Sequence, residues 1–200
     1  MKNIAVFASG SGSNFQAIID VIQAGELDAN ISILVCDKPN AYAIKRARVA
    51  GIPSFIFNPK DYTSKEDYEK DIATELKSKG VEFVVLAGYM RLIGDTLLEE
   101  YEGRIVNIHP SLLPDFPGKD AIGQALDAKV KVSGVTIHFV DKGMDTGPII
   151  VQERVRLDQF ETRESLQGKI HSIEHKLYPS TLQMLLTQGG EIYGKKARTN

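Results

Sequence analysis

The stretch of sequence at residues 3–18, NIAVFASGSGSNFQAI, predicts the class of fold. Its first half is almost continuously apolar, which is typical of a strand buried on both faces of a parallel sheet. A turn rich in glycine and serine follows at residues 9–13, and an amphipathic segment begins at Asn14. The stretch therefore predicts a strand, a tight turn and a helix, which is the opening unit of an α/β fold.

The same alternation continues along the chain. Further apolar runs at residues 31–36, 53–58, 83–88 and 104–108 are predicted strands. Helices are predicted between the strands at residues 14–24, 41–50, 64–79 and 94–101. This order favours an α/β, Rossmann-like, doubly wound and mostly parallel sheet.

The last third of the chain has a different pattern. In GVTIHFV, residues 134–140, apolar and polar residues alternate, and GPIIVQERVRL, residues 147–157, follows a glycine-rich turn. Two such runs predict an antiparallel C-terminal extension of the sheet. A final helix is expected at about residues 162–187. We find no repeat or linker, so we expect a single domain over residues 1–200.

Composition limits the classes of function. The 200 residues are 42% hydrophobic and 25% charged, with a formal net charge of −2, which argues against broad binding to nucleic acid or to an anionic membrane. Cys36 is the only cysteine, so neither an intrachain disulfide nor a cysteine zinc cluster is possible. No apolar run approaches the roughly 18 residues that span a bilayer, and no secretion signal is evident. We expect a cytoplasmic protein.

The glycine-rich turn is a candidate anion site. Gly10 and Gly12 permit backbone conformations that a side chain would block, and N–H groups at the start of a helix attract anions. A dinucleotide fingerprint would need a third glycine where this chain has Phe15, and the Gly-Lys pair of a Walker loop is absent. A phosphate monoester held by Gly12, Ser13 and Asn14 therefore fits best, although a turn that binds nothing is the simpler alternative.

The strand that ends at residues 107–109 is a candidate catalytic site. Side chains alternate along a strand, so Asn107 and His109 project to one side, and α/β sheets bind ligands at the carboxyl ends of their strands. An asparagine amide suits a developing oxyanion, and a histidine can move a proton near neutral pH. The pair suggests acyl-type transfer; the alternative is a buried histidine beside a turn-capping asparagine. Asp141 or Asp145 could supply a carboxylate to the histidine, and spacing alone does not decide between them.

Four motifs together resemble the glycinamide ribonucleotide formyltransferase family. They are SGSGSN at residues 9–14, LAGYMRL at 86–92, NIHPSLLPDFPG at 107–118 and HFVDKGMDTGPII at 138–150. The resemblance covers about residues 3–180. It implies the formyltransferase fold and an enzyme of purine synthesis that uses 10-formyltetrahydrofolate as co-substrate. The last three motifs are shared by formyltetrahydrofolate users generally, whereas the glycine-rich loop points to the ribonucleotide branch.

The resemblance also assigns roles residue by residue. It implies that Asn107, His109 and Asp145 are catalytic. It implies that the ribonucleotide is bound by Gly12, Ser13, Asn14 and Glu174. It implies that folate is bound by Asn107 and by Lys65, Met90, Arg91, Leu92, Ile93, Asp141, Lys142, Gly143, Met144 and Asp145. Lys65 stands where members often carry arginine, and Asp120 where many carry histidine, which leaves a role for position 120 open.

The implied reaction is a direct transfer in which the substrate amine attacks the formyl carbon, without a covalent enzyme intermediate and without a metal. Residues 171–175, HSIEH, match the H-x-x-E-H zinc motif, but we interpret them as a helix surface from which Glu174 reaches the substrate. The same motifs leave room for a formyltetrahydrofolate hydrolase, a methionyl-tRNA formyltransferase, or a non-catalytic phosphosugar or folate-binding module. We expect small-molecule partners and a monomer or homodimer.

Overall fold

The computed structural model describes residues 1–187, so the last part of the predicted domain, residues 188–200, lies outside the described residues. Seven strands form a single sheet: β1 (Lys2–Ala8), β2 (Ala29–Cys36), β3 (Ser54–Ile56), β4 (Phe83–Leu86), β5 (Ile105–His109), β6 (Val132–Phe139) and β7 (Ile149–Arg156). Their order across the sheet is β3-β2-β1-β4-β5-β6-β7.

The pairing of the strands confirms the predicted topology. The strands β1 to β5 are parallel, whereas β6 pairs antiparallel with β5 and β7 pairs antiparallel with β6. After β3 the chain returns to the other side of β1 to form β4, so the strand order reverses between β1 and β4. Such a reversal leaves a crevice outside the carboxyl ends of the strands, where α/β proteins bind ligands.

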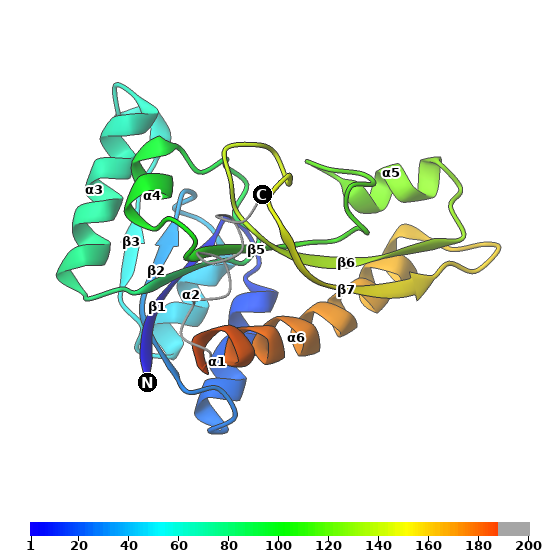
Figure 1. Ribbon diagram of the computed structural model, residues 1–200, viewed down its shortest axis with the longest axis horizontal. Helices are drawn as coiled ribbons and strands as arrows, with labels where there is room; N and C mark the ends of the chain where they lie inside the picture. Colours follow the sequence, from blue (N-terminus) through cyan, green and yellow to red (C-terminus); the bar gives the residue numbers. More distant parts are fainter. Residues whose placement is uncertain (188–200) are drawn as a thin grey trace, which may run out of the picture.

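Helices cover both faces of the parallel part of the sheet (Figure 1). They are α1 (Ser13–Gln23), α2 (Tyr42–Val49), α3 (Lys65–Ser78), α4 (Asp95–Glu100) and α6 (Arg163–Thr187), with a 3-10 turn at Pro59–Asp61. Helix α5 (Ala121–Asp127) lies at the other end of the molecule, beside β6 and α6. Residues of α1, α2 and α6 pack in one core cluster, and residues of α3 and α4 pack in the other.

Strand β1 shows why the opening stretch is apolar throughout. Ile4, Val6 and Ala8 belong to one core cluster, and Ala5 and Phe7 belong to the other. Side chains of a strand alternate between the faces of the sheet, so a central strand with helices on both faces must be apolar at every position. All five side chains are fully buried.

Two elements differ from the sequence prediction. Helix α5 was not predicted, because it has only seven residues and contains Gly123, so it carries little helical periodicity. Strand β3 has three residues where residues 53–58 were predicted to be extended, because it lies at the edge of the sheet and pairs only with β2.

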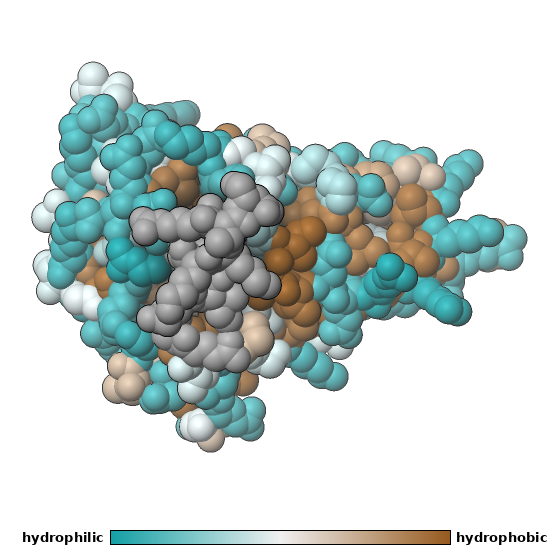
Figure 2. All heavy atoms as spheres, viewed as in Figure 1, coloured by the Kyte–Doolittle hydropathy of each residue, from teal (hydrophilic) through white to brown (hydrophobic). Residues whose placement is uncertain are grey.

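The far end of the sheet is less covered. β7 is the edge strand, most of its residues are exposed or half-buried, and Ile149 is 48% exposed. Figure 2 shows apolar atoms gathered over the middle of the view, where β6 and β7 run in Figure 1. Among the described residues, no helix combines the length and apolar character needed to cross a membrane.

Candidate active site

One cavity of about 570 Å³ lies along the carboxyl ends of β1, β4 and β5. It contains most of the residues that the sequence singled out: Gly12, Ser13, Asn14, Met90, Arg91, Leu92, Ile93, Asn107, His109, Gly143, Met144, Asp145 and Glu174. Residues from the first loop, the middle strands, a late hairpin and the last helix thus share one space, as the reversal of strand order predicts.

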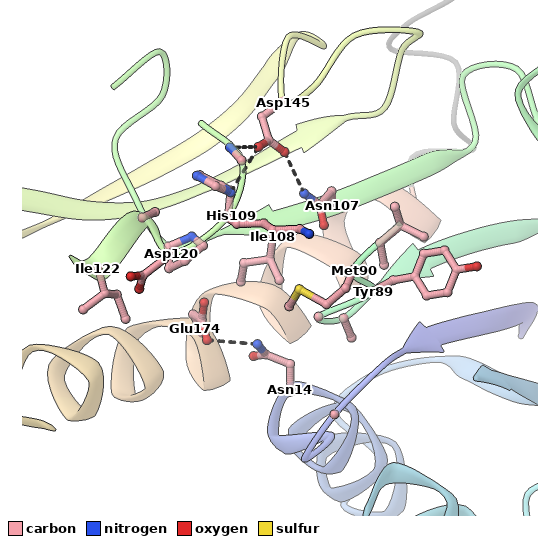
Figure 3. A pocket seen from close by; sticks show the side chains of 18 of the residues that line it. Asn14, Tyr89, Met90, Asn107, Ile108, His109, Asp120, Ile122, Asp145 and Glu174 are labelled. Atoms are coloured by element: carbon pink, nitrogen blue, oxygen red, sulfur yellow. Dashed lines mark hydrogen bonds and ion pairs between the residues drawn. The ribbon is translucent and has the colours of Figure 1, made fainter. Parts of the chain in front are cut away.

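Asn107, His109 and Asp145 point toward one another on one wall of this cavity (Figure 3). Oδ2 of Asp145 lies 3.4 Å from Nδ1 of His109, and Oδ1 of Asp145 lies 3.4 Å from Nδ2 of Asn107. Asn107 and His109 are two apart on β5, and the alternation of that strand gives them a common side, as predicted. The structure therefore places Asp145 rather than Asp141 beside the pair.

Both ring nitrogens of His109 face acceptors. Nε2 lies 2.8 Å from the carbonyl oxygen of Phe116, which can only accept, so this nitrogen donates a proton. Nδ1 faces the Asp145 carboxylate. The ring is thus held between a backbone carbonyl and a carboxylate, in an orientation from which it can act on a reacting group.

Asp145 is held in one orientation by its surroundings. Its backbone is left-handed, with φ 56°, and its Oδ2 accepts a hydrogen bond of 2.7 Å from the N–H of Gly118. Burial opposes ionisation, but the interaction with His138, the hydrogen bond from Gly118 and the charge of His109 outweigh it. The pKa of Asp145 therefore lies below its ordinary value, and the side chain is a carboxylate at neutral pH.

His138 lies behind this cluster, on the neighbouring strand β6. It is 2% exposed, its Nδ1 lies 2.8 Å from the carbonyl oxygen of Phe139, and its Nε2 lies 3.2 Å from Nδ2 of Asn107. Nε2 also lies 3.6 Å from Oδ1 of Asp145, so this nitrogen faces both the Asn107 amide and the Asp145 carboxylate. His138 thus fixes the direction of that amide.

The glycine loop forms the opposite end of the cavity. Gly12 is the residue before α1, with a left-handed φ of 71°, and a Cβ there would lie 2.9 Å from Cβ of Ala43. Gly10 has no such constraint, because its φ is not left-handed and a Cβ there would meet nothing within 4 Å, so the expectation that a side chain would block its conformation was wrong. Arg46 braces the loop by donating from Nε to the Ser11 carbonyl at 2.8 Å.

The start of α1 is suited to an anion. The first N–H groups of a helix have no partner within the helix, and the helix dipole is positive at this end. No acidic residue occupies the first turn of α1. Ser13 and Asn14 line the cavity at this end, and the phosphate site stays a prediction.

Glu174 of α6 faces this loop across the cavity. Its Oε2 accepts a hydrogen bond of 2.9 Å from Nδ2 of Asn14, while Oδ1 of Asn14 is buried without a partner (Figure 3). The interpretation of residues 171–175 as a helix surface was wrong for Glu174, which is only 5% exposed. Burial raises its pKa to about 7, and the bond from Asn14 offsets only part of that effect.

The apolar wall of the cavity is the segment between β4 and α4. Met90 is 58% exposed and Leu92 is 48% exposed, so these side chains are available to a flat, apolar ligand. Three residues predicted to bind folate do not line the cavity. Lys65 lies against Gly94, Lys142 pairs with Asp95 at 2.9 Å, and Asp141 accepts hydrogen bonds within its own loop.

The H-x-x-E-H segment carries no metal cluster. His171 and His175 stack on each other with ring centroids 5.8 Å apart, and the part of the chain that the structure describes has no group of three or more metal-ligating side chains. Burial lowers the pKa of both histidines. His171 lines the cavity one turn before Glu174.

The formyl transferase family matches residues 2–182 of this sequence. A phosphoribosylglycinamide formyltransferase of Bacillus subtilis (strain 168) is 55% identical over 186 residues, which are 93% of this chain and 95% of that protein. The chain belongs to the formyl transferase family.

Solved structures agree with this membership. A glycinamide ribonucleotide transformylase from Geobacillus kaustophilus is 58% identical, covers 93% of this chain and 99% of its own, and superimposes with a TM-score of 0.91. A phosphoribosylglycinamide formyltransferase from Bacillus halodurans is 55% identical, covers 97% and 100%, and has a TM-score of 0.92. The family resemblance and the fold predicted from sequence are therefore confirmed.

In this formyl transferase, cavity-lining residues that precede Glu174 on α6 were not predicted from the sequence. Arg163, Gln167 and His171 also line the cavity, and their spacing of four residues places them on one face of the helix. That spacing was the available signal. Asp120, whose role the sequence left open, pairs with Arg163 through two hydrogen bonds of 2.6 and 2.9 Å from the guanidinium. Its carboxylate also caps the start of α5.

Proposed function

We propose that this formyl transferase moves the formyl group of 10-formyltetrahydrofolate to the amine of glycinamide ribonucleotide, in purine biosynthesis. The observation that carries the proposal is the place of the Asn107–His109–Asp145 cluster. It lies in the same cavity as a phosphate-type loop and an apolar wall. Relatives that align over nearly the whole chain bear the name of this activity.

Each end of the cavity suits one substrate. The N–H groups of Ser13 and Asn14 would bind the phosphate of the ribonucleotide, and Glu174 with the unpartnered Oδ1 of Asn14 would accept from its ribose hydroxyls. The apolar wall at Met90 and Leu92 would hold the folate ring system. The substrate amine and the formyl group then meet beside the cluster.

The transfer needs no protein nucleophile. The amine nitrogen attacks the formyl carbon, and the carbonyl oxygen of the resulting tetrahedral intermediate becomes negative. The Asn107 amide donates to that oxygen, and the imidazolium of His109 stabilises it by charge. The attacking nitrogen loses a proton to the Asp145 carboxylate, directly or through water. The bond from the formyl carbon to the folate nitrogen then breaks, and that nitrogen takes up a proton that His109 can supply.

Asp145 and His138 prepare Asn107 for this role. Its amide nitrogen has two hydrogens, and its contact of 3.4 Å to Asp145 is long for a hydrogen bond. The formyl oxygen can therefore take one hydrogen of the amide while the contact of 3.2 Å to His138 keeps its direction. This is pre-organisation of an oxyanion donor by a buried neighbour.

One experiment separates this function from a hydrolase and from a binding module. The purified protein is incubated with 10-formyltetrahydrofolate and glycinamide ribonucleotide, with each omitted in turn, and the deformylated folate and the formylated ribonucleotide are measured. We expect both products only when both substrates are present. Formate release without the ribonucleotide would establish a hydrolase, and substrate binding without any turnover would establish a binding module.

We further propose that the enzyme works in the cytoplasm, as a monomer or homodimer, without a resident metal or nucleic-acid partner. The support is that the cluster, the glycine loop and the apolar wall suffice for the proposed transfer of a formyl group between two small molecules. Light scattering coupled to size exclusion, with and without both substrates, measures the oligomeric state. Activity that survives dialysis against a chelator is the result expected of a metal-free enzyme.

A further inference from the structure

The apolar wall of the cavity is irregular in backbone and yet held at both ends. Residues 87–94, between β4 and α4, belong to no helix or strand. Such a segment cannot rely on the hydrogen bonds of a sheet or helix to fix its shape. Backbone hydrogen bonds to Phe7 and Ser9 hold Ala87 and Gly88. Beyond them the side-chain contacts come from two buried carboxylates, Asp37 and Glu69, neither of which lines the cavity.

Asp37 holds the first end of the segment. It follows β2 directly and its side chain is 2% exposed. Its Oδ2 accepts a hydrogen bond of 2.7 Å from Nε of Arg91, and its Oδ1 accepts one of 2.5 Å from the hydroxyl of Ser9. That hydroxyl in turn accepts a bond of 2.9 Å from the backbone N–H of Met90. One carboxylate thus joins the ends of β1 and β2 to the wall.

Glu69 holds the second end. It lies on α3, is 2% exposed, and its Oε1 accepts a hydrogen bond of 2.7 Å from the N–H of Gly94. Gly94 precedes α4, so Glu69 serves as the cap of that helix from a different element. A Cβ on Gly94 would lie 2.6 Å from Oε2 of Glu69, so a side chain at this position would displace the carboxylate.

We propose that Asp37 and Glu69 are positioning residues that set the backbone of residues 88–94 at the spacing the folate ring system requires. A buried carboxylate is costly unless it is paired and hydrogen-bonded, and apolar packing would serve stability alone equally well. Two such carboxylates, one at each end of the segment, therefore fix the backbone conformation of that segment. This inference rests on the proposed function, because it takes the folate as the occupant of this wall.

The test is a comparison of steady-state constants for Asp37→Ala and Glu69→Gln with those of the unaltered enzyme. We expect Asp37→Ala to raise KM for 10-formyltetrahydrofolate by about ten- to a hundredfold, since a displacement of about 1 Å can cost that much. The kcat at saturation and KM for the ribonucleotide should change by less than about twofold. Glu69→Gln keeps an acceptor for Gly94 and should raise the folate KM less than Asp37→Ala does.

Three further variants keep the test decisive. Asp37→Asn retains one acceptor and should restore part of the folate KM; Ser9→Ala removes the hydroxyl bridge and replaces Asp37→Ala if that protein does not fold. Thr181→Val is the control for general loosening, because its buried hydroxyl bonds only within α6, to the Leu177 carbonyl, and does not line the cavity. We expect it to lower Tm without raising the folate KM.

The outcomes separate this inference from the function on which it rests. If the unaltered enzyme makes no formylated ribonucleotide, the proposed function fails. If it is active and Asp37→Ala leaves the folate KM unchanged, or raises both KM values equally, the positioning role is refuted. A rise in folate KM in Thr181→Val equal to that of Asp37→Ala refutes it as well.

Discussion

Replacing Glu174 by glutamine removes a buried ionisable group from the wall that faces the phosphate loop. The pKa of this carboxyl is about 7 in the folded protein, against an ordinary value of 4.5. Between these two values the folded state binds more protons than the unfolded state, so the contribution of Glu174 to stability falls as pH rises. Glutamine keeps an acceptor for the Asn14 amide and has no charge to bury.

The size of the effect follows from the shift. One pKa unit corresponds to about 1.4 kcal/mol, so ionising Glu174 in the folded protein costs about 3 kcal/mol at pH 8 and almost nothing at pH 4.5. For a chain of this length about 1 kcal/mol moves Tm by about 2–4 °C. We therefore expect the Tm of Glu174→Gln, relative to the unaltered protein, to rise by about 6–12 °C between pH 4.5 and pH 8.

The assay is thermal unfolding of both proteins, without substrate, at several pH values from 4.5 to 8. Other groups titrate over this range, but they are common to both proteins and cancel in the difference of Tm. A constant difference across the range would refute the raised pKa and the burial that causes it. If the Tm of Glu174→Gln, relative to that of the unaltered protein, fell as pH rises, the pKa of Glu174 would be lowered rather than raised in the folded state.

Three further results are expected. Asn107→Ala, His109→Ala and Asp145→Asn should each lower kcat by at least about 10²-fold, which is the typical effect of removing an oxyanion donor, while Tm stays within a few degrees. Rapid turnover in any of these variants removes that residue from the mechanism. Gly12→Ala should raise KM for the ribonucleotide selectively, because its Cβ would meet Ala43 and its φ is left-handed, and an unchanged KM would contradict the phosphate site. Tyr178→Phe removes a buried hydroxyl that lies 2.8 Å from the Leu86 carbonyl and 3.2 Å from the Val106 carbonyl, and should cost about 1 kcal/mol in urea unfolding, against none if the hydroxyl is unimportant.

The sequence predicted the sheet well because its evidence is local. Strand β1 is apolar at every position because helices cover both of its faces, whereas β6 alternates apolar residues with polar ones such as Thr136 and His138, so the two could be told apart by their patterns alone. Helix α5 could not be predicted in the same way. Its start depends on Asp120, which caps it and pairs with Arg163 some 43 residues later, and no local pattern reports such a contact.

The residues of the candidate site differ in the same way: some follow from the local pattern of the sequence and others depend on distant contacts. Alternation gave Asn107 and His109 a common side, and the rule for α/β sheets gave that side a crevice. Spacing could not choose between Asp141 and Asp145, because the choice depends on how the loop between β6 and β7 folds back, where the N–H of Gly118 meets Asp145. Nor could it show that Glu174 is buried, since that follows from the docking of α6 on α1.

The hydrogen bond between Asn14 and Glu174 joins residues 160 positions apart. A ribosome therefore makes the phosphate loop long before it makes the residue that completes the other side of the cavity. Until α6 has left the ribosome, helix α1 lacks the helix that packs against it in the finished protein. The covering of α1 and the completion of the cavity by Glu174 are thus the same late event in synthesis. A nascent chain that stops before α6 lacks both, and apolar surface exposed at that stage favours aggregation.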